Sequence, residues 1–418
     1  MVSVALTDNV MRAADGTPLK VKLKQTERLR QLKAVGLVAP LFLFILLSFV
    51  APIANMLFYS VNNPELVHTL SRTAAALENW DGEALPGEEA FEALAMDIQQ
   101  AREEKTIGLI AKRLNYELPA IRSDVMATGR ALEDVEAGPW KDVLVDIEGV
   151  WGELGTWAVI KRATSPYTDF YFLSAVDRMR DATGSIVAIP EGQAIFAKVY
   201  IRTFYISTIV TLVTLFLGFP VAYLLATLPT RYSNLLMILV LLPFWTSLLV
   251  RTTAWVVLLQ SEGLVNSGLM WLGLIDERVQ LIYNRFGTII AMAHIQLPFT
   301  LLPIYSVMKT IPSSHVRAAR SLGAGPFYAF WRVYFPQTIP GIAAGCLLTF
   351  ILCLGYYITP ALVGGPSDQM VSYFVAFYTN QELNWGMAGA LGVILLLVTF
   401  LIYFVYNKLV GIDRMKLG

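Results

Sequence analysis

Six long apolar stretches constrain this 418-residue chain more than any other feature. They cover residues 34–58, 204–228, 234–260, 288–308, 339–363 and 386–410. A helix needs about 20 mainly apolar residues to cross a bilayer, and these stretches are continuous rather than alternating, which disfavours membrane-spanning strands. Only 15% of the residues are charged, against about a quarter in ordinary soluble chains. The sequence therefore predicts an all-α integral membrane protein with six transmembrane helices.

A formal charge of zero conceals a division of charge along the chain. Residues 61–197 carry 12 Lys and Arg against 23 Asp and Glu, whereas residues 309–336 carry four Lys and Arg and no acid. Cytoplasmic loops of membrane proteins hold the excess of Lys and Arg. We therefore expect both termini and the 309–336 loop in the cytoplasm, and the acidic segment outside. The predicted divisions are a tail at 1–33, transmembrane helix 1 at 34–60, an extracytoplasmic insertion at 61–197, a core with helices 2–6 at 198–410 and a tail at 411–418.

The acidic insertion reads as mostly helical. Residues 87–114 and 141–160 contain good helix formers with apolar side chains at helical spacing, among them Phe91 and Trp157. This apolar material is enough for a small domain that packs on itself or on a partner, and the alternative is a simple spacer. The insertion contains no Cys, so no disulfide secures it.

No motif for catalysis, metal binding or phosphate binding is found in the sequence. The two cysteines, Cys346 and Cys353, lie in one apolar stretch, and His68, His294 and His315 lie in different segments without an HExxH pattern. There is no Gly-Lys pair and hence no P-loop, and the cations that orient the helices leave no basic surface for nucleic acid. The chain is thus predicted to bind no cofactor, and work against a gradient would need energy from a partner or an ion.

Polar and amphipathic side chains inside the apolar stretches are candidates for a solute pathway. The clearest is Arg251, because an Arg in mid-span costs roughly 2.5–3.5 kcal/mol on insertion scales. Trp245, Gln296, Tyr356 and Tyr357 complete the candidate set. Such groups can line a translocation cavity, although hydrogen bonding between helices or core packing would also account for them.

The 309–336 loop holds the most informative motif. Ser313 or Ser314 can cap a short helix that Gly323 or Gly325 ends, with Leu322 continuing its apolar face. A second helix opening at Pro326 carries aromatic residues at helical spacing, namely Phe327, Phe330, Trp331 and Tyr334. This predicts a helical hairpin at the inner membrane surface that suits docking into a groove on a soluble partner.

The run Arg317-Ala318-Ala319-Arg320-Ser321-Leu322-Gly323-Ala324 resembles the EAA loop of permease subunits in bacterial ATP-binding-cassette importers. Residues 242–252 and 297–299 are similar to the spermidine/putrescine branch of that family. The resemblance implies that the loop helix couples to an ATPase through Arg317, Ala318, Ala319, Leu322, Gly323 and Ala324. The first of these replaces the family's glutamate, a charge reversal that an acidic patch on the partner could match. The long insertion also departs from the better-known polyamine permeases.

The same resemblance implies the type I importer permease fold in a bacterial inner membrane. It implies a second permease subunit, two ATPase subunits that hold the ATP and Mg, and an extracytoplasmic binding protein that delivers a small solute, with a polyamine or a related amine or amino-acid derivative favoured. The insertion would then dock or gate the binding protein. Two other classes stay open: a membrane-anchored receptor or scaffold with a ligand-binding outer domain, and an ion-coupled carrier.

Overall fold

The computed structural model describes residues 19–135, 137–181 and 183–410. Within them, six helical segments are long and apolar enough to cross a membrane, which confirms the predicted number. These segments are Thr26–Phe58, Phe196–Thr227, Leu248–Trp271, Arg285–Thr310, Pro326–Leu354 and Trp385–Lys408. The chain forms two compact units, the first ending at Phe58 and the second beginning at Tyr59.

The first unit is one long helical segment. α1 (Leu19–Ile45) passes through the π-helical turn η1 (Leu46–Val50) into α2 (Ala51–Phe58). Its apolar side chains, such as Leu37 and Phe42, are exposed in this unit. A helix of this length and composition is suited to lipid or to other apolar helices rather than to water.

The outer insertion is built from short helices and one hairpin. They are α3 (Pro64–Val67), α4 (Ser71–Ala76), α5 (Glu88–Glu103), α6 (Ile107–Asn115), α7 (Ile121–Ala131), η2 (Leu132–Asp134), α8 (Trp140–Ile147), η3 (Gly149–Gly152), α9 (Leu154–Ala163), α10 (Phe170–Ala175), β1 (Arg178–Arg180) and β2 (Ile186–Ala188). The two strands pair antiparallel, with Met179 opposite Val187. The predicted helical character is confirmed.

The insertion has an apolar core of its own. Phe91, Trp151 and Trp157 are fully buried, and the Phe91 and Trp157 ring centroids lie 4.5 Å apart. Both indole N–H groups are satisfied: Trp151 donates to Thr128 Oγ1 at 2.9 Å, and Trp157 donates to the Trp151 carbonyl at 2.8 Å. Buried tryptophans stabilise a core in this way only when the N–H finds an acceptor.

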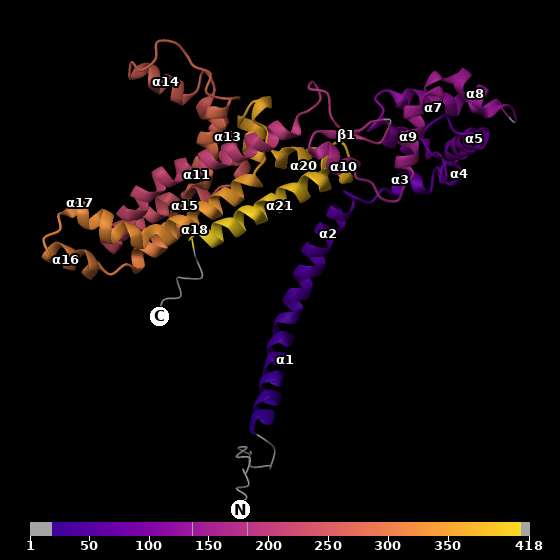
Figure 1. Cartoon of the computed structure of the whole chain (residues 1–418). Helices are drawn as coiled ribbons and strands as arrows, with labels where there is room; N and C mark the ends of the chain where they lie inside the picture. Colours follow the sequence, from indigo (N-terminus) through magenta and orange to yellow (C-terminus); the bar gives the residue numbers. More distant parts are fainter. Residues whose placement is uncertain (1–18, 136, 182, 411–418) are drawn as a thin grey trace, which may run out of the picture. The chain divides into compact units, whose positions relative to one another are not determined.

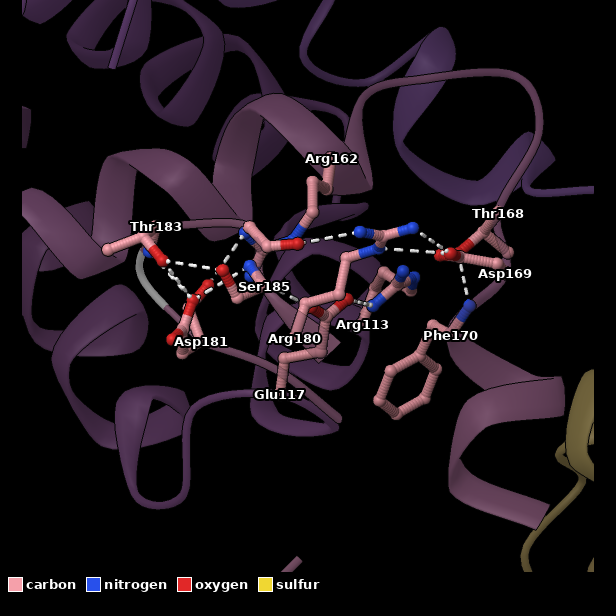
Figure 2. A network of polar contacts seen from close by, with 11 residues as sticks. Arg113, Glu117, Arg162, Thr168, Asp169, Phe170, Arg180, Asp181, Thr183 and Ser185 are labelled. Atoms are coloured by element: carbon pink, nitrogen blue, oxygen red, sulfur yellow. Dashed lines mark hydrogen bonds and ion pairs between the residues drawn. The ribbon is translucent and has the colours of Figure 1, made fainter. Parts of the chain in front are cut away.

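A network of charged side chains fastens the hairpin to this helical core (Figure 2). Arg113, which is 0% exposed, donates to Glu117 at 2.9 Å, and Arg162 lies 3.5 Å from the other oxygen of that carboxylate. Arg180 in β1 donates to Asp169, just before α10, at 2.6 and 2.9 Å. The hydrogen bond to Asp169 and the attraction of its charge raise the pKa of Arg180 above the ordinary value. Ion pairs thus join α6 to α9 and β1 to the start of α10, and Arg162 links the two sets by donating to the Asp181 carbonyl at 3.3 Å.

The remaining elements form the membrane core of the second unit. They are α11 (Phe196–Thr227), α12 (Thr230–Leu241), η4 (Leu242–Trp245), α13 (Leu248–Leu259), α14 (Leu264–Trp271), α15 (Arg285–Thr310), α16 (Ser313–Ser321), α17 (Pro326–Ala329), η5 (Phe330–Tyr334), α18 (Phe335–Leu354), α19 (Ile358–Val363), η6 (Pro366–Asp368), α20 (Val371–Asn380) and α21 (Trp385–Val410). Figure 1 shows α11, α15, α18 and α21 side by side, with α16 and α17 at one end of this bundle and α10 and α20 at the other.

Small and hydroxyl side chains bring α11, α15 and α18 together. Thr300 donates to the Thr214 hydroxyl at 2.8 Å and lies 2.6 Å from the Thr349 hydroxyl, all three being buried. Gly341 and Gly345 form a GxxxG spacing on α18, and a Cβ at either would come within 3.0 Å of an α15 atom. Close backbone approach of this kind is the usual role of that spacing in membrane helices.

The prediction of one continuous helix over residues 234–260 is wrong. This stretch is divided into α12, η4 and α13. Pro243 has no backbone N–H with which to continue a helix. Ser247 Oγ accepts the N–H of Val250 at 3.2 Å and caps α13. The membrane-length segment of this region is Leu248–Trp271.

The fifth stretch, predicted over 339–363, also ends early. α18 ends at Leu354, residues 355–357 are not helical, and α19 follows. Pro360 lies in the first turn of α19, where its missing N–H has no intrahelical partner to lose. The interruption leaves Tyr356 and Tyr357 between two helices rather than inside one.

The outer insertion is packed against the outer ends of the membrane helices. Tyr171 and Ala175 of α10 share a buried apolar cluster with Phe196 of α11, Val371 of α20 and Met387 of α21. This cluster excludes a loosely tethered spacer, because burial of large apolar side chains ties α10 to three helices at once.

Two further contacts fix this joint. A Cβ at Gly386 would lie 2.4 to 2.7 Å from three ring atoms of Tyr171, so only glycine lets the ring rest on α21. The Asp177 carboxylate accepts the backbone N–H groups of Ile195, Phe196 and Ala197 at 3.1, 3.0 and 2.7 Å. An acid in this place satisfies free donors at the start of α11 and complements the helix dipole.

Candidate functional site

The 309–336 loop folds as a helical hairpin, as predicted. α16 ends where Gly323 adopts a φ of +92°, a left-handed conformation that favours glycine, and α17 begins at Pro326. The predicted cap is wrong: Pro312 occupies the N-cap position and Ser313 is the first helical residue, without a side-chain cap.

The predicted aromatic helix is α17 followed by the π-helical turn η5. Phe330 and Tyr334 pack edge-on against Tyr223 of α11, each with ring centroids 5.5 Å apart. Phe327 and Trp331 are exposed. One side of the aromatic row therefore anchors the hairpin to the bundle, and the other side is presented outward.

The coupling candidates lie on different sides of α16. Ala318 and Leu322 face outward, and Leu322 is 90% exposed, so the apolar face that Leu322 continues is uncovered in this chain. Ala319 and Ala324 are half-buried. Arg317 belongs to the side that lines a cavity shared with α11, α15 and η5. These residues form one motif in the sequence, but in the structure they lie on different sides of α16.

A second group of polar and aromatic residues lies around α13. The Arg251 guanidinium carbon is 5.9 Å from the centroid of the Phe244 ring, which in turn lies 5.1 Å from the ring of Phe299 on α15. Among the described residues, Arg251 Nε is buried without a hydrogen-bond partner. The Arg251 guanidinium is held on the face of an aromatic ring, and its Nε–H group has no acceptor within the described residues. This N–H group is therefore available to a hydrogen-bond acceptor from outside this chain.

Neighbours of Arg251 extend this group across three helices. Trp255 donates to His294 Nδ1 at 3.1 Å, and Thr252 lies 3.1 Å from the Thr359 hydroxyl. Sequence reasoning did not select His294 or the two threonines, because their proximity to Arg251 depends on how α13, α15 and α19 pack.

The other pathway candidates are not gathered with Arg251. Gln296 is buried on α15, and its Oε1 has no partner within the described ranges. Trp245 is 74% exposed and Tyr357 is 39% exposed in this chain. The structure thus places Arg251 beside Phe244, packs Tyr356 against a buried cluster of α11 and α15, buries Gln296 and leaves the other two at the surface.

The membrane core of this chain is similar to a known family of transport proteins. A profile described as "binding-protein-dependent transport system inner membrane component" matches residues 192–412, just over half of the chain. The chain belongs to this permease family. The match begins immediately before α11, so most of the outer insertion lies outside it. The predicted importer permease fold with an added outer region is confirmed, as is a multi-pass protein of the inner membrane.

Relatives of the permease include polyamine transport proteins. The spermidine/putrescine transport system permease protein PotB of Escherichia coli (strain K12) is 32% identical over 212 residues, 51% of this chain and 77% of the relative. PotB of Haemophilus influenzae is 33% identical over 220 residues, 52% and 77% of the two chains. The inner membrane permease YdcU of Escherichia coli (strain K12) is 32% identical over 229 residues, 51% and 71%. The predicted resemblance to the spermidine/putrescine branch is confirmed.

Among solved structures, the permease is similar to a chain of a bacterial alginate ABC transporter crystallised with an alginate pentasaccharide-bound periplasmic protein. The sequence identity is 20% and the TM-score 0.45, over 53% of this chain and 80% of that one.

Proposed function

We propose that this permease forms, with a second permease subunit, the translocation path of an ATP-driven importer for a small solute. The observation that carries the proposal is the rigid inner hairpin, α16 and α17, held on the bundle by Phe330 and Tyr334 within the region that matches the permease family. In this proposal two ATPase subunits hold the ATP and Mg, and no cofactor is bound by this chain. Both termini and the hairpin face the cytoplasm.

The hairpin is suited to transmit movement of the ATPase to the spans. Ala318 and Leu322 on the outward side of α16 offer small and apolar surface for a groove on the partner. The aromatic anchors make α16 a short lever fixed to α11, because a π-helical turn packed against Tyr223 continues directly into α18. We infer that Arg317, Ala318, Ala319, Leu322, Gly323 and Ala324 form the coupling element.

Gly323 provides the experiment. Gly323→Asp forces a side chain onto a backbone with a φ of +92°, so α16 should lose its end geometry while the spans still insert. We expect normal membrane levels and no uptake. The control is Gly325→Ala, where φ is −62° and nothing lies within 4 Å of an added Cβ. Uptake by a well-expressed Gly323→Asp variant at the level of Gly325→Ala would contradict the coupling role.

The alternatives differ in simple measurements. A receptor or scaffold would not purify with an ATPase, and an ion-coupled carrier would retain uptake after ATP is depleted but lose it when the ion gradient collapses. Co-purification of an ATPase with this chain, together with uptake that requires ATP, is the result expected of the importer.

For the solute, two observations point in different directions. Relatives named as spermidine/putrescine permeases favour a polyamine, whereas the unpaired Nε of Arg251 favours a solute that also carries a carboxylate. An amine or amino-acid derivative satisfies both. We propose that Arg251 and Tyr356 line the pathway, and that Trp245, Gln296 and Tyr357 belong to it when the second permease is present. Competition of uptake by spermidine and by carboxylated amines distinguishes the classes.

The outer insertion is proposed to dock or gate an extracytoplasmic binding protein. Its surplus of acid offers electrostatic steering, and its packing through Tyr171 onto α21 gives it a direct mechanical connection to a span. Deletion of residues 61–169 should remove stimulation of the ATPase by the binding protein. Full stimulation in the deleted protein would refute this role.

A further inference from the structure

A cavity behind the inner hairpin combines two cations with apolar walls. It measures about 470 Å³ and lies between α16, the inner ends of α11 and α15, and η5. Its lining includes Tyr223, Met308, Val316, Phe330 and the two arginines Arg317 and Arg320. A cavity with a cationic rim and an aromatic and apolar interior fits a molecule that is itself anionic at one end and apolar elsewhere.

Both arginines lie on one side of α16. Positions 313, 316, 317 and 320 all line the cavity, and their spacing of i, i+3, i+4 and i+7 is that of one helix face. The outward residues Ala318 and Leu322 occupy the opposite side. The two arginines are exposed and line the cavity side of α16, so Arg317 is the member of the coupling element that faces the cavity.

Within the described residues, no acid neutralises these arginines. Residues 309–336 contain no Asp or Glu. Neither Arg317 nor Arg320 is in an ion pair with an acid in the described part of the chain. Two like charges held three residues apart on one helix repel each other slightly, so an anion between them would relieve that repulsion. The planar guanidinium favours phosphate, which it can bind through two parallel hydrogen bonds.

The place of the cavity in the fold identifies the source of the phosphate. α11 ends at Thr227 and α15 at Thr310, and both residues border the point where long apolar helices give way to a polar loop. This is the depth at which phospholipid headgroups lie, and basic pockets between membrane helices at a cytoplasmic surface bind anionic headgroups. The apolar wall of Met308 and Val316 continues toward the spans and suits an acyl chain.

We propose that Arg317 and Arg320 bind the phosphate of an anionic phospholipid of the inner leaflet, which occupies the space behind α16. The bound lipid braces the hairpin from its membrane side and leaves Ala318 and Leu322 free for a partner. The site rests on the cytoplasmic position of the hairpin proposed above, but it needs only the bilayer and does not depend on ATPase docking.

The test uses the purified full-length permease in nanodiscs of phosphatidylcholine with and without phosphatidylglycerol. Lipid that remains bound after transfer to detergent is identified by native mass spectrometry. Since each cation near an anionic surface contributes about 1 kcal/mol, the pair Arg317→Gln/Arg320→Gln should lower the preference for phosphatidylglycerol by roughly 30-fold. The pair Arg317→Lys/Arg320→Lys keeps the charge and should keep part of the preference, which guards against a loss caused by misfolding.

The control pair is Lys309→Gln/Arg332→Gln, which removes two cations of the same loop that do not line the cavity. It should retain the wild-type preference. An equal loss in both pairs, or no preference in the wild type, would overturn the proposal. If inorganic phosphate displaces the lipid at millimolar concentration, the site is a simple anion site and the proposal also fails. Loss of ATPase co-purification without any lipid preference would instead assign the arginines to an acidic partner surface.

Discussion

The contact between Gly386 and Tyr171 provides the sharpest test of how the outer insertion is held. The Tyr171 side chain is buried, at 5% exposure, and its ring rests on the first turn of α21. In Gly386→Ala the added Cβ would begin 2.4 to 2.7 Å from three ring atoms. Real Cβ contacts are not this short, so the ring must move by about an ångström away from α21, against a packed cluster.

The expected cost follows from overpacking. Inserting a methyl group into a packed core lowers the free energy of unfolding by about 1–3 kcal/mol. Tyr171→Ala removes the ring and should cost about 3–5 kcal/mol alone. Since the clash needs the ring, Gly386→Ala should cost nothing further in the Tyr171→Ala background. The double-mutant cycle should therefore give a coupling energy of about 1–3 kcal/mol.

The assay is equilibrium or thermal unfolding of the purified protein in one detergent, read from tryptophan fluorescence. Gly108→Ala is the matched control, because it places a methyl group on another helix with nothing within 4 Å. That control should be neutral or slightly stabilising. If Gly386→Ala unfolds like the wild type, or if its cost persists after Tyr171→Ala, the contact does not hold the joint and the reasoning is refuted.

Four further outcomes can be checked separately. Asp177→Ala should lower the free energy of unfolding by about 1–2 kcal/mol, because three N–H groups of α11 lose their acceptor, with Asp177→Asn losing less; equal melting of both variants and wild type would contradict this. Thr300→Val should cost about 1–3 kcal/mol, because the buried Thr349 hydroxyl loses its partner and Thr214 loses a donor while keeping its bond to the Thr211 carbonyl, and Thr300→Ser should cost less; the reverse order would argue against the hydrogen bonds. Hydrogen bonds from Thr183 and nearby backbone N–H groups lower the pKa of Asp181 from its ordinary value of 3.8. The ionised carboxylate therefore stabilises the fold fully above the ordinary pKa, and this stabilisation is lost as the pH falls through the lowered pKa. Asp181→Asn should remove this part of the acid-induced loss, and an unchanged melting profile between pH 2 and pH 5 would oppose it. Arg251→Gln should insert normally but raise the KM for a carboxylated solute by about tenfold, as expected for one lost charge-assisted hydrogen bond; unchanged uptake kinetics would remove Arg251 from the pathway.

Features of this protein that depend on neighbours in the chain were predictable. Continuous apolar stretches predicted the number of spans, since a helix satisfies its own backbone in lipid. Gly323 and Pro326 predicted where α16 ends and α17 begins, because their backbone restrictions are intrinsic to the residue. The division of the third span at Pro243 was missed, because proline also occurs inside membrane helices that bend without breaking, as at Pro220 of α11.

The surroundings of the candidate site residues depend on helices that are far apart in the sequence. Spacing alone placed Arg317 in a coupling motif, but only the position of α16 against α11 and η5 shows that its side lines a cavity with Arg320. Arg251 was selected by its cost in a span, yet the contact of its helix with His294 of α15, made through Trp255, comes from packing of separate helices.

The sequence by itself determined that the chain crosses a membrane six times, that charge is divided along it, and that its inner loop has a permease motif, because hydropathy, charge and backbone preference belong to residues one at a time. Only the tertiary structure decided that the insertion is fastened to α21 by a ring lying on Gly386, more than 200 residues further along the chain. Close packing between distant segments depends on the shapes of both surfaces, and neither segment carries that information alone.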